Sequence, residues 1–261
     1  MNGNDFREPA GGDGALQLDL LDEVRQGDRA DSPRVRVSRR ARRLSVRVYP
    51  DARVEVVAPV RARPREIERF VAAHREWIDE KRAQALRNRP APQVFPPAEV
   101  ELRCTRETFR LQLAGGAGKL RLSERGSSAA CVLRIAGSSA GLRPALRAWL
   151  MRAARERLEP RVAALAAATG VSYARVSIRR QRSRWGSCSA RGTISLNCCL
   201  LFQRPEVVDY LIIHELMHVS QMNHSAKFWR AVERHCADWR SLDRELLQGW
   251  RHVPRWVFSD G

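Results

Sequence analysis

The sequence predicts an α+β fold, and three patterns support it. Apolar and polar residues alternate over residues 44–48 and again over 54–58, on either side of a turn at Pro50-Asp51-Ala52, which predicts a hairpin with one apolar face. An apolar stripe at helical spacing over residues 64–78 predicts a helix that begins at Pro64. A further long helical region is expected between Gly141 and Gly170, where the glycine ends it.

Length and charge narrow the class of protein. The 261 residues include 47 Lys+Arg against 29 Asp+Glu, so the net charge is +18. This length suits one larger domain or two modest ones, and the composition excludes collagen, a coiled-coil rod and wholesale disorder. The excess is arginine, since only Lys81, Lys119 and Lys227 are lysines. Such a balance is typical of proteins with polyanionic partners, but a composition bias spread over solvated faces would give the same count.

The charge is unevenly distributed along the chain. Residues 1–33 hold eight acidic residues against three arginines, a local charge of 3 − 8 = −5, which leaves +23 for the rest. We therefore expect residues 1–33 to form a disordered acidic tail. Residues 34–140 are expected to form an N-terminal β-rich subdomain with one helix, and residues 141–261 to form the domain that carries the candidate site.

Nothing in the sequence indicates a membrane or secretory protein. The first 31 residues lack the apolar core of a signal peptide. The most apolar stretch, residues 207–219, contains Asp209, His214, Glu215 and His218, so it does not read as a membrane span. Six cysteines without a CxxC pair are expected to be reduced and mostly packed. We expect a cytoplasmic protein without a membrane partner.

Several shorter elements complete the expectation. Strands are predicted near residues 109–113, 119–122 and 131–135, and Pro160 is expected to kink or split the long helix. A strand over 176–185, a tight turn at 189–192 and a return strand over 193–201 predict a second hairpin. A helix is expected to begin at Pro205.

That last helix carries the chemistry. Residues 214–218 read His-Glu-Leu-Met-His, an H-E-x-x-H pattern. Residues four apart on a helix differ by roughly 40° in direction, so both imidazoles project from one face. Two neutral imidazoles suit Zn²⁺. Glu215, beside the first histidine, can act as general base on a metal-bound water.

A catalytic zinc usually takes three protein ligands, and His224 is the preferred third. It lies six residues after His218, so the helix must stop and the chain must turn back. Asn223 tolerates the left-handed conformation of such a stop, and Ser225 can cap the next helix. Glu233 and His235 are alternative third ligands. A structural zinc or a coincidental helix pair would explain the pattern without catalysis.

The chain resembles a known family at several spaced motifs. These are the Arg-Trp-Gly-Ser-Cys-Ser run at 184–189, Gly-Thr-Ile-Ser-Leu-Asn at 192–197, the H-E-x-x-H helix, and Asn-His-Ser-x-x-Phe-Trp at 223–229. Together they resemble the YgjP-like metallopeptidase domain, which is related to the SprT-like zincins. One departure is Ala237, which precedes Asp238-Trp239 where a proline is often found.

The resemblance implies a fold, a cofactor and roles for four residues. It implies a zincin-like domain, with the H-E-x-x-H helix packed on a small β-sheet and an N-terminal β-rich extension. It also implies a zinc-dependent hydrolase with His214, His218 and His224 on zinc and Glu215 as catalytic acid/base.

Residues near this motif have two interpretations each. Residues 184–186 either form a substrate-facing edge or only pack within the hairpin. Tyr210 lies one turn before His214 and is expected to be a buried wall rather than a group that polarises substrate. Asp209 and Asp238 are either partners of a ligand imidazole or ordinary surface and capping groups. Cys188 is expected to be a packing residue.

Three functions remain open from the sequence. The leading hypothesis is hydrolysis of an amide bond in a peptide or protein substrate. The second is a metal-dependent nucleoside triphosphate pyrophosphatase, an activity proposed within the family, for which the arginines would contact phosphate. The third is a DNA-associated, SprT-like protease whose arginine-rich surface binds nucleic acid. The sequence does not indicate an oligomeric state.

Overall fold

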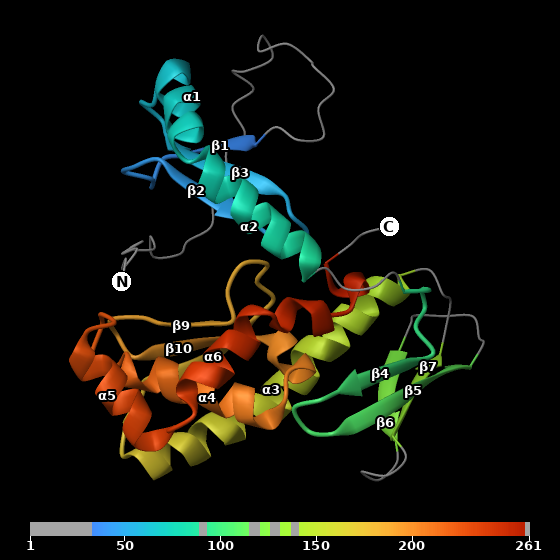
Figure 1. The fold of residues 1–261 in the computed structure, drawn as a ribbon. Helices are drawn as coiled ribbons and strands as arrows, with labels where there is room; N and C mark the ends of the chain where they lie inside the picture. Colours follow the sequence, from blue (N-terminus) through green and yellow to red (C-terminus); the bar gives the residue numbers. More distant parts are fainter. Residues whose placement is uncertain (1–32, 89–92, 115–120, 126–130, 137–140, 259–261) are drawn as a thin grey trace. The chain divides into compact units, whose positions relative to one another are not determined.

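A computed structural model describes residues 33–88, 93–114, 121–125, 131–136 and 141–258. Except for Pro33, the acidic tail expected at 1–33 lies outside these residues. The chain divides into two compact units, Met1–Arg89 and Pro90–Gly261, which appear in blue to cyan and in green to red in Figure 1. The mixture of small sheets and helices confirms the predicted α+β class.

The first unit contains a three-stranded sheet in the order β1-β3-β2. Its strands are β1 (Arg34–Ser38), β2 (Ser45–Val48) and β3 (Val54–Pro59). β2 and β3 pair antiparallel, with Val46 opposite Val56, which confirms the predicted hairpin. β1 was not predicted and pairs parallel to β3.

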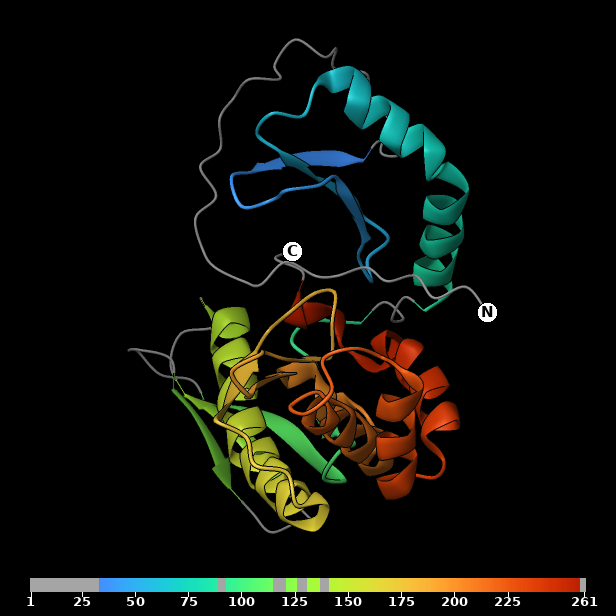
Figure 2. The same cartoon turned by 90° about the vertical axis from the view of Figure 1, so that its left-hand side faces the viewer.

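Two helices follow, α1 (Pro64–Ala73) and α2 (Arg75–Arg87). The prediction of one continuous helix over 64–78 is wrong, because the backbone leaves helical geometry at His74. The His74 ring lies at the break, where its Nδ1 is 2.8 Å from the Phe70 carbonyl oxygen. The predicted apolar stripe nevertheless packs on the sheet, and Ile78 is only 5% exposed. Figure 2 shows both helices on the same side of these strands.

The second unit begins with a four-stranded sheet in the order β4-β5-β7-β6. Its strands are β4 (Glu99–Leu102), β5 (Glu107–Ala114), β6 (Arg121–Arg125) and β7 (Cys131–Ala136). The strands expected near 109–113 and 131–135 are confirmed as β5 and β7. The one expected at 119–122 is found at 121–125, with residues 119 and 120 outside the described part. β4 was not predicted.

This sheet shares its core with the long helix α3 (Leu142–Thr169). Trp149 meets Phe109 edge-on, with ring centroids 5.3 Å apart. Arg157 donates to Glu107 at 2.7 and 3.0 Å and to Glu124 at 3.0 Å. These contacts explain why the units divide at 89/90 and not at the predicted boundary of 140/141.

α3 continues through Pro160, so the proline does not split it. The buried side chains Leu158 and Val162 hold the helix against the core on both sides of the proline. The helix ends, as predicted, at Gly170, which has φ +69. α3 also packs against α4 and β8.

A third sheet contains β8 (Arg175–Arg179), β9 (Gly186–Cys188) and β10 (Thr193–Asn197) in the order β8-β10-β9. The turn at 189–192 is confirmed, with Gly192 at φ +72. The strand predicted over 176–185 is wrong in extent, because β8 ends at Arg179 and pairs parallel to β10. The antiparallel partner of β10 is β9. The return strand ends at Asn197, where the 3-10 helix Cys198–Phe202 begins.

The intervening loop is fixed by Asn197. This fully buried amide donates to the carbonyls of Gln181 and Arg184 at 2.7 and 2.8 Å and accepts from the Cys199 amide at 3.1 Å. A buried amide with these partners determines where the chain re-enters the sheet. It therefore sets the position of β9.

Three helices and two 3-10 turns complete the unit. They are α4 (Pro205–Met217), α5 (Ala226–His235), α6 (Trp239–Leu247), Gly249–His252 and Arg255–Val257. α4 is buried on nearly every side and packs against α3, α5, α6 and β9. None of the helices in the described part of the chain combines the length and apolar character needed to cross a bilayer.

Candidate metal centre

The centre is built on α4 and the turn that follows it. Pro205 occupies the first turn of α4, where its missing N–H costs nothing. The helix ends at Met217, and the chain turns back before α5 begins, so the predicted stop is confirmed. Asn223 does not provide it, since Ala52 and Arg106 are the non-glycine residues with positive φ in the described chain. Ser225 is the N-cap of α5, as predicted, but its side chain makes no capping hydrogen bond.

The turn brings three imidazoles together. The Nε2 atoms of His214 and His218 are 3.2 Å apart, and each lies 3.1 Å from Nε2 of His224. Ligands of a tetrahedral zinc at about 2.0–2.1 Å from the ion are about 3.3 Å from one another. The donor type and the spacing therefore both fit a zinc ion held on one side by three histidines.

The protonation of the rings suits a ligand role. Burial, together with the charges of His218 and His224, lowers the pKa of His214 to about 3. Burial also lowers the pKa of His218. Both rings are therefore neutral at neutral pH. His218 Nδ1–H donates to the Gln221 carbonyl at 2.9 Å, which leaves its Nε2 lone pair directed at the other two rings.

Behind His214 lies Tyr210, which is 1% exposed and confirms the expected buried wall. Its hydroxyl donates to Asp243 Oδ1 at 2.8 Å. The Tyr210 hydroxyl oxygen also lies 3.5 Å from His214 Nδ1, within reach of that ring's N–H. Asp243 is absent from the sequence-based candidates, because no local spacing links it to a histidine 29 positions earlier.

Aromatic rings surround the remaining histidines. The Phe228 ring stacks on His218 with centroids 4.4 Å apart. The Trp229 ring stacks on His224 at 5.6 Å and 26°. Both aromatic residues come from the first turn of α5, directly after the histidine of the turn.

The Glu215 side chain extends from α4 to β9 of the third sheet. Its side chain is 5% exposed, and a Cβ at Gly186 of β9 would lie 2.7 Å from Glu215 Oε1. Only glycine fits here without moving the carboxylate. Burial, with the nearby Glu215 charge, raises the pKa of Cys188 to about 11, so this residue is a thiol at neutral pH. That agrees with the packing role expected for Cys188.

The other sequence candidates lie apart from the three histidines. Glu233 pairs with Arg240 at 2.9 Å, and neither it nor His235 joins the metal-binding group found among the described residues. Asp209 forms an ion pair with Arg161, whose Nη2 donates to Oδ2 at 2.8 Å. Asp238 is the N-cap of α6, without a side-chain capping bond. The interpretation of Asp209 and Asp238 as ordinary structural groups is the one that fits.

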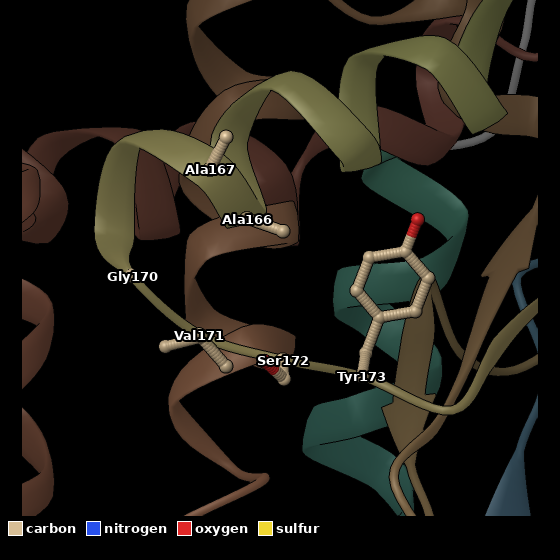
Figure 3. A pocket seen from close by; sticks show the side chains of 6 residues that line it. All are labelled: Ala166, Ala167, Gly170, Val171, Ser172 and Tyr173. Carbon is tan, nitrogen blue, oxygen red and sulfur yellow. The ribbon is translucent and has the colours of Figure 1, made fainter.

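A separate hollow lies at the C-terminal end of α3 (Figure 3). Its lining has no histidine, cysteine or carboxylate and consists of Ala166, Ala167, Gly170, Val171, Ser172 and Tyr173. This lining offers no metal-binding group, so the histidine cluster stays the candidate site.

A known protein family matches most of the chain. Residues 42–248 match the YgjP-like metallopeptidase domain. The chain belongs to this family. The match spans most of both compact units and contains all three histidines of the cluster. Membership confirms the resemblance inferred from the motifs and supports a hydrolase of the metallopeptidase type.

Two solved structures are similar to part of this family member. The metallopeptidase zymogen of Pyrococcus abyssi abylysin has 26% identity and a TM-score of 0.31, covering 33% of this chain and 88% of that one. The metallopeptidase zymogen of Methanocaldococcus jannaschii jannalysin has 21% identity and a TM-score of 0.29, covering 33% and 90%. No curated protein sequence gave a significant match.

Proposed function

We propose that this family member is a zinc-dependent hydrolase that cleaves an amide bond in a peptide or protein. The observation that carries the proposal is the triangle of Nε2 atoms 3.1–3.2 Å apart beside the buried carboxylate of Glu215. Three imidazoles together with a carboxylate are the donor set and base of a hydrolytic zinc site.

His214, His218 and His224 would hold the zinc ion. When bound, zinc supplies a Lewis acid that polarises the scissile carbonyl and increases the acidity of water. The Glu215 carboxylate accepts a proton from the attacking water and returns it to the leaving amine nitrogen. Its burial against β9 excludes bulk water and fixes the carboxylate in one place.

The substrate is proposed to bind along β9. This strand pairs with β10 on one side and forms the edge of the third sheet as described. The backbone groups of an edge strand can pair with an extended peptide. Gly186 sits on this strand against Glu215, so a peptide added here would pass close to the base.

The first test compares zinc content and turnover in wild type and Glu215→Gln. We expect the variant to retain about one zinc per chain and to lose about 10²–10⁴-fold in turnover, because the proton acceptor is gone. Glu206→Gln is the matched control, since this exposed carboxylate lies on the same helix and pairs with Arg204. It should change neither quantity. Normal turnover by Glu215→Gln would reject the proposed role.

The substrate class is tested on zinc-loaded wild type. The panel contains denatured casein, short peptides and nucleoside triphosphates, each with and without DNA. Amide cleavage that is independent of DNA supports the proposal. Pyrophosphate release without peptide cleavage would overturn it in favour of a pyrophosphatase, and cleavage only with DNA would favour the DNA-associated protease.

A further inference from the structure

We propose that α6 positions two of the three metal-binding histidines, although it contributes no ligand. The inference rests on the proposed zinc site. It concerns three α6 residues, Trp239, Arg240 and Asp243, which we call the positioning residues. Each is connected to a histidine through one or two intervening side chains.

The first connection reaches His214. Asp243 accepts a hydrogen bond from the Tyr210 hydroxyl at 2.8 Å. Because that hydrogen is directed at Asp243, the lone pairs of the Tyr210 oxygen are left for His214 Nδ1–H, 3.5 Å away. A proton on Nδ1 keeps the Nε2 lone pair free to face His218 and His224. Asp243 thus sets both the tautomer and the orientation of His214.

The second connection reaches His224, which lies on the exposed turn outside any helix. Its ring stacks on Trp229, and Trp229 stacks on Trp239 at 4.1 Å and 15°. The Arg240 guanidinium lies 4.5 Å from the Trp239 ring centroid and donates to Glu233 at 2.9 Å. The side chains of Trp229, Trp239 and Arg240 thus form a stack that supports the His224 ring, which the local backbone alone would leave mobile.

Both connections depend on one rigid helix. Trp239 and Asp243 are four residues apart, so they leave α6 in directions that differ by roughly 40°. α6 is docked by buried Leu246 and by Arg204, which donates to both oxygens of Glu245 at 2.8 and 2.6 Å. Since Arg204 is the N-cap of α4, the helix with the ligands and the helix behind them are joined.

The test measures zinc affinity of the full chain by competition with a chromogenic chelator. We expect Asp243→Ala and Trp239→Leu each to weaken zinc binding by about 10-fold to 100-fold, as loss of outer partners of metal ligands does. Asp243→Asn and Trp239→Phe keep an acceptor and a stacking ring, and should restore most of the affinity. Thermal unfolding of the metal-free variants shows whether they are folded.

A cobalt-substituted sample gives a second readout. The visible spectrum of Co²⁺ reports the geometry of its ligands. We expect Asp243→Ala and Trp239→Leu to shift this spectrum, whereas the conservative variants retain the wild-type bands. An unchanged spectrum in Asp243→Ala and Trp239→Leu would overturn the inference, because their ligands would then be in the wild-type positions.

Glu245→Gln is the matched control on the same helix. It removes the charge from the pair with Arg204, but the amide oxygen can still accept a hydrogen bond and buried Leu246 still docks α6. The variant touches neither connection, so it should lower stability slightly and leave zinc affinity unchanged. Equal weakening by Glu245→Gln would overturn the inference, since docking of α6 alone would explain the effect. Wild-type affinity in Asp243→Ala and Trp239→Leu would overturn the inference but would leave the proposed function standing. A wild type that binds no zinc would overturn the proposed function together with it.

Discussion

At the scale of single residues, a few close contacts position the side chains of the candidate site. The three Nε2 atoms lie within 3.2 Å of one another, and His218 is held by the Gln221 carbonyl. Glu215 fills the space that a side chain at residue 186 would need. The chemistry therefore depends on a glycine as much as on the titratable groups.

Gly186→Ala tests that dependence. The added Cβ would lie 2.7 Å from Oε1 and 2.9 Å from Cγ of Glu215, which is closer than real contacts allow. The carboxylate must then shift, and we expect kcat to fall by about 100-fold for a misplacement on the order of 1 Å. Zinc content should stay at the wild-type level, as measured by metal analysis. A variant with normal kcat would show that this contact does not position the base.

The histidines were predictable from the sequence, and some of their partners were not. His214 and His218 share a helical face because of local geometry. His224 could be inferred as the third ligand because a catalytic zinc usually needs one and a chain that turns back after the helix returns His224 to that face. Asp243 could not, because its link to His214 passes through Tyr210 and depends on how α6 packs on α4. The role of Trp239 could not be predicted either, because its stack on Trp229 depends on the same packing.

At the scale of elements, pairing between distant segments is what the sequence failed to show. The period-2 pattern after residue 175 marks extended chain but not its partner. In the structure β8 pairs parallel to β10, and β9 is the antiparallel partner of β10. The buried amide of Asn197 explains this outcome, because it binds carbonyls of the loop between β8 and β9.

The contact of β5 and β6 with α3 makes stability depend on acid pH. Hydrogen bonds from Arg157 lower the pKa of Glu107 below its unfolded value. The ionised Glu107 therefore stabilises the fold fully above about pH 4.3, its unfolded pKa, and this contribution is lost as the pH falls through the lower folded pKa. Arg157 also binds Glu124, so the pair is part of a network.

Glu107→Gln measures this contribution. At pH 7 we expect the variant to be less stable by on the order of 1.5–3 kcal/mol, the size of a hydrogen bond to a charged group. The difference should shrink as the pH falls below about 4. Urea unfolding followed by tryptophan fluorescence, repeated between pH 7 and pH 3, gives both values. A difference that stays constant over this range would contradict the assigned ion pair.

At the scale of the whole molecule, the chain consists of two compact units, Met1–Arg89 and Pro90–Gly261. The candidate metal centre lies entirely in the second. The sequence places a boundary at 140/141, at the glycine- and serine-rich segment, because composition marks loops and not cores. The shared core of Phe109, Leu133 and Trp149 shows that this segment joins parts of one unit.

The central claim is that three histidines hold a zinc ion, and X-ray absorption at the zinc edge tests it most directly. The fine structure of the stoichiometric zinc-loaded protein should contain the pattern of three imidazoles with nitrogen at about 2.0–2.1 Å, and no sulfur at about 2.3 Å. His224→Ala should lose one imidazole from that pattern. A thiolate ligand, or a wild-type pattern that is unchanged in His224→Ala, would contradict the account.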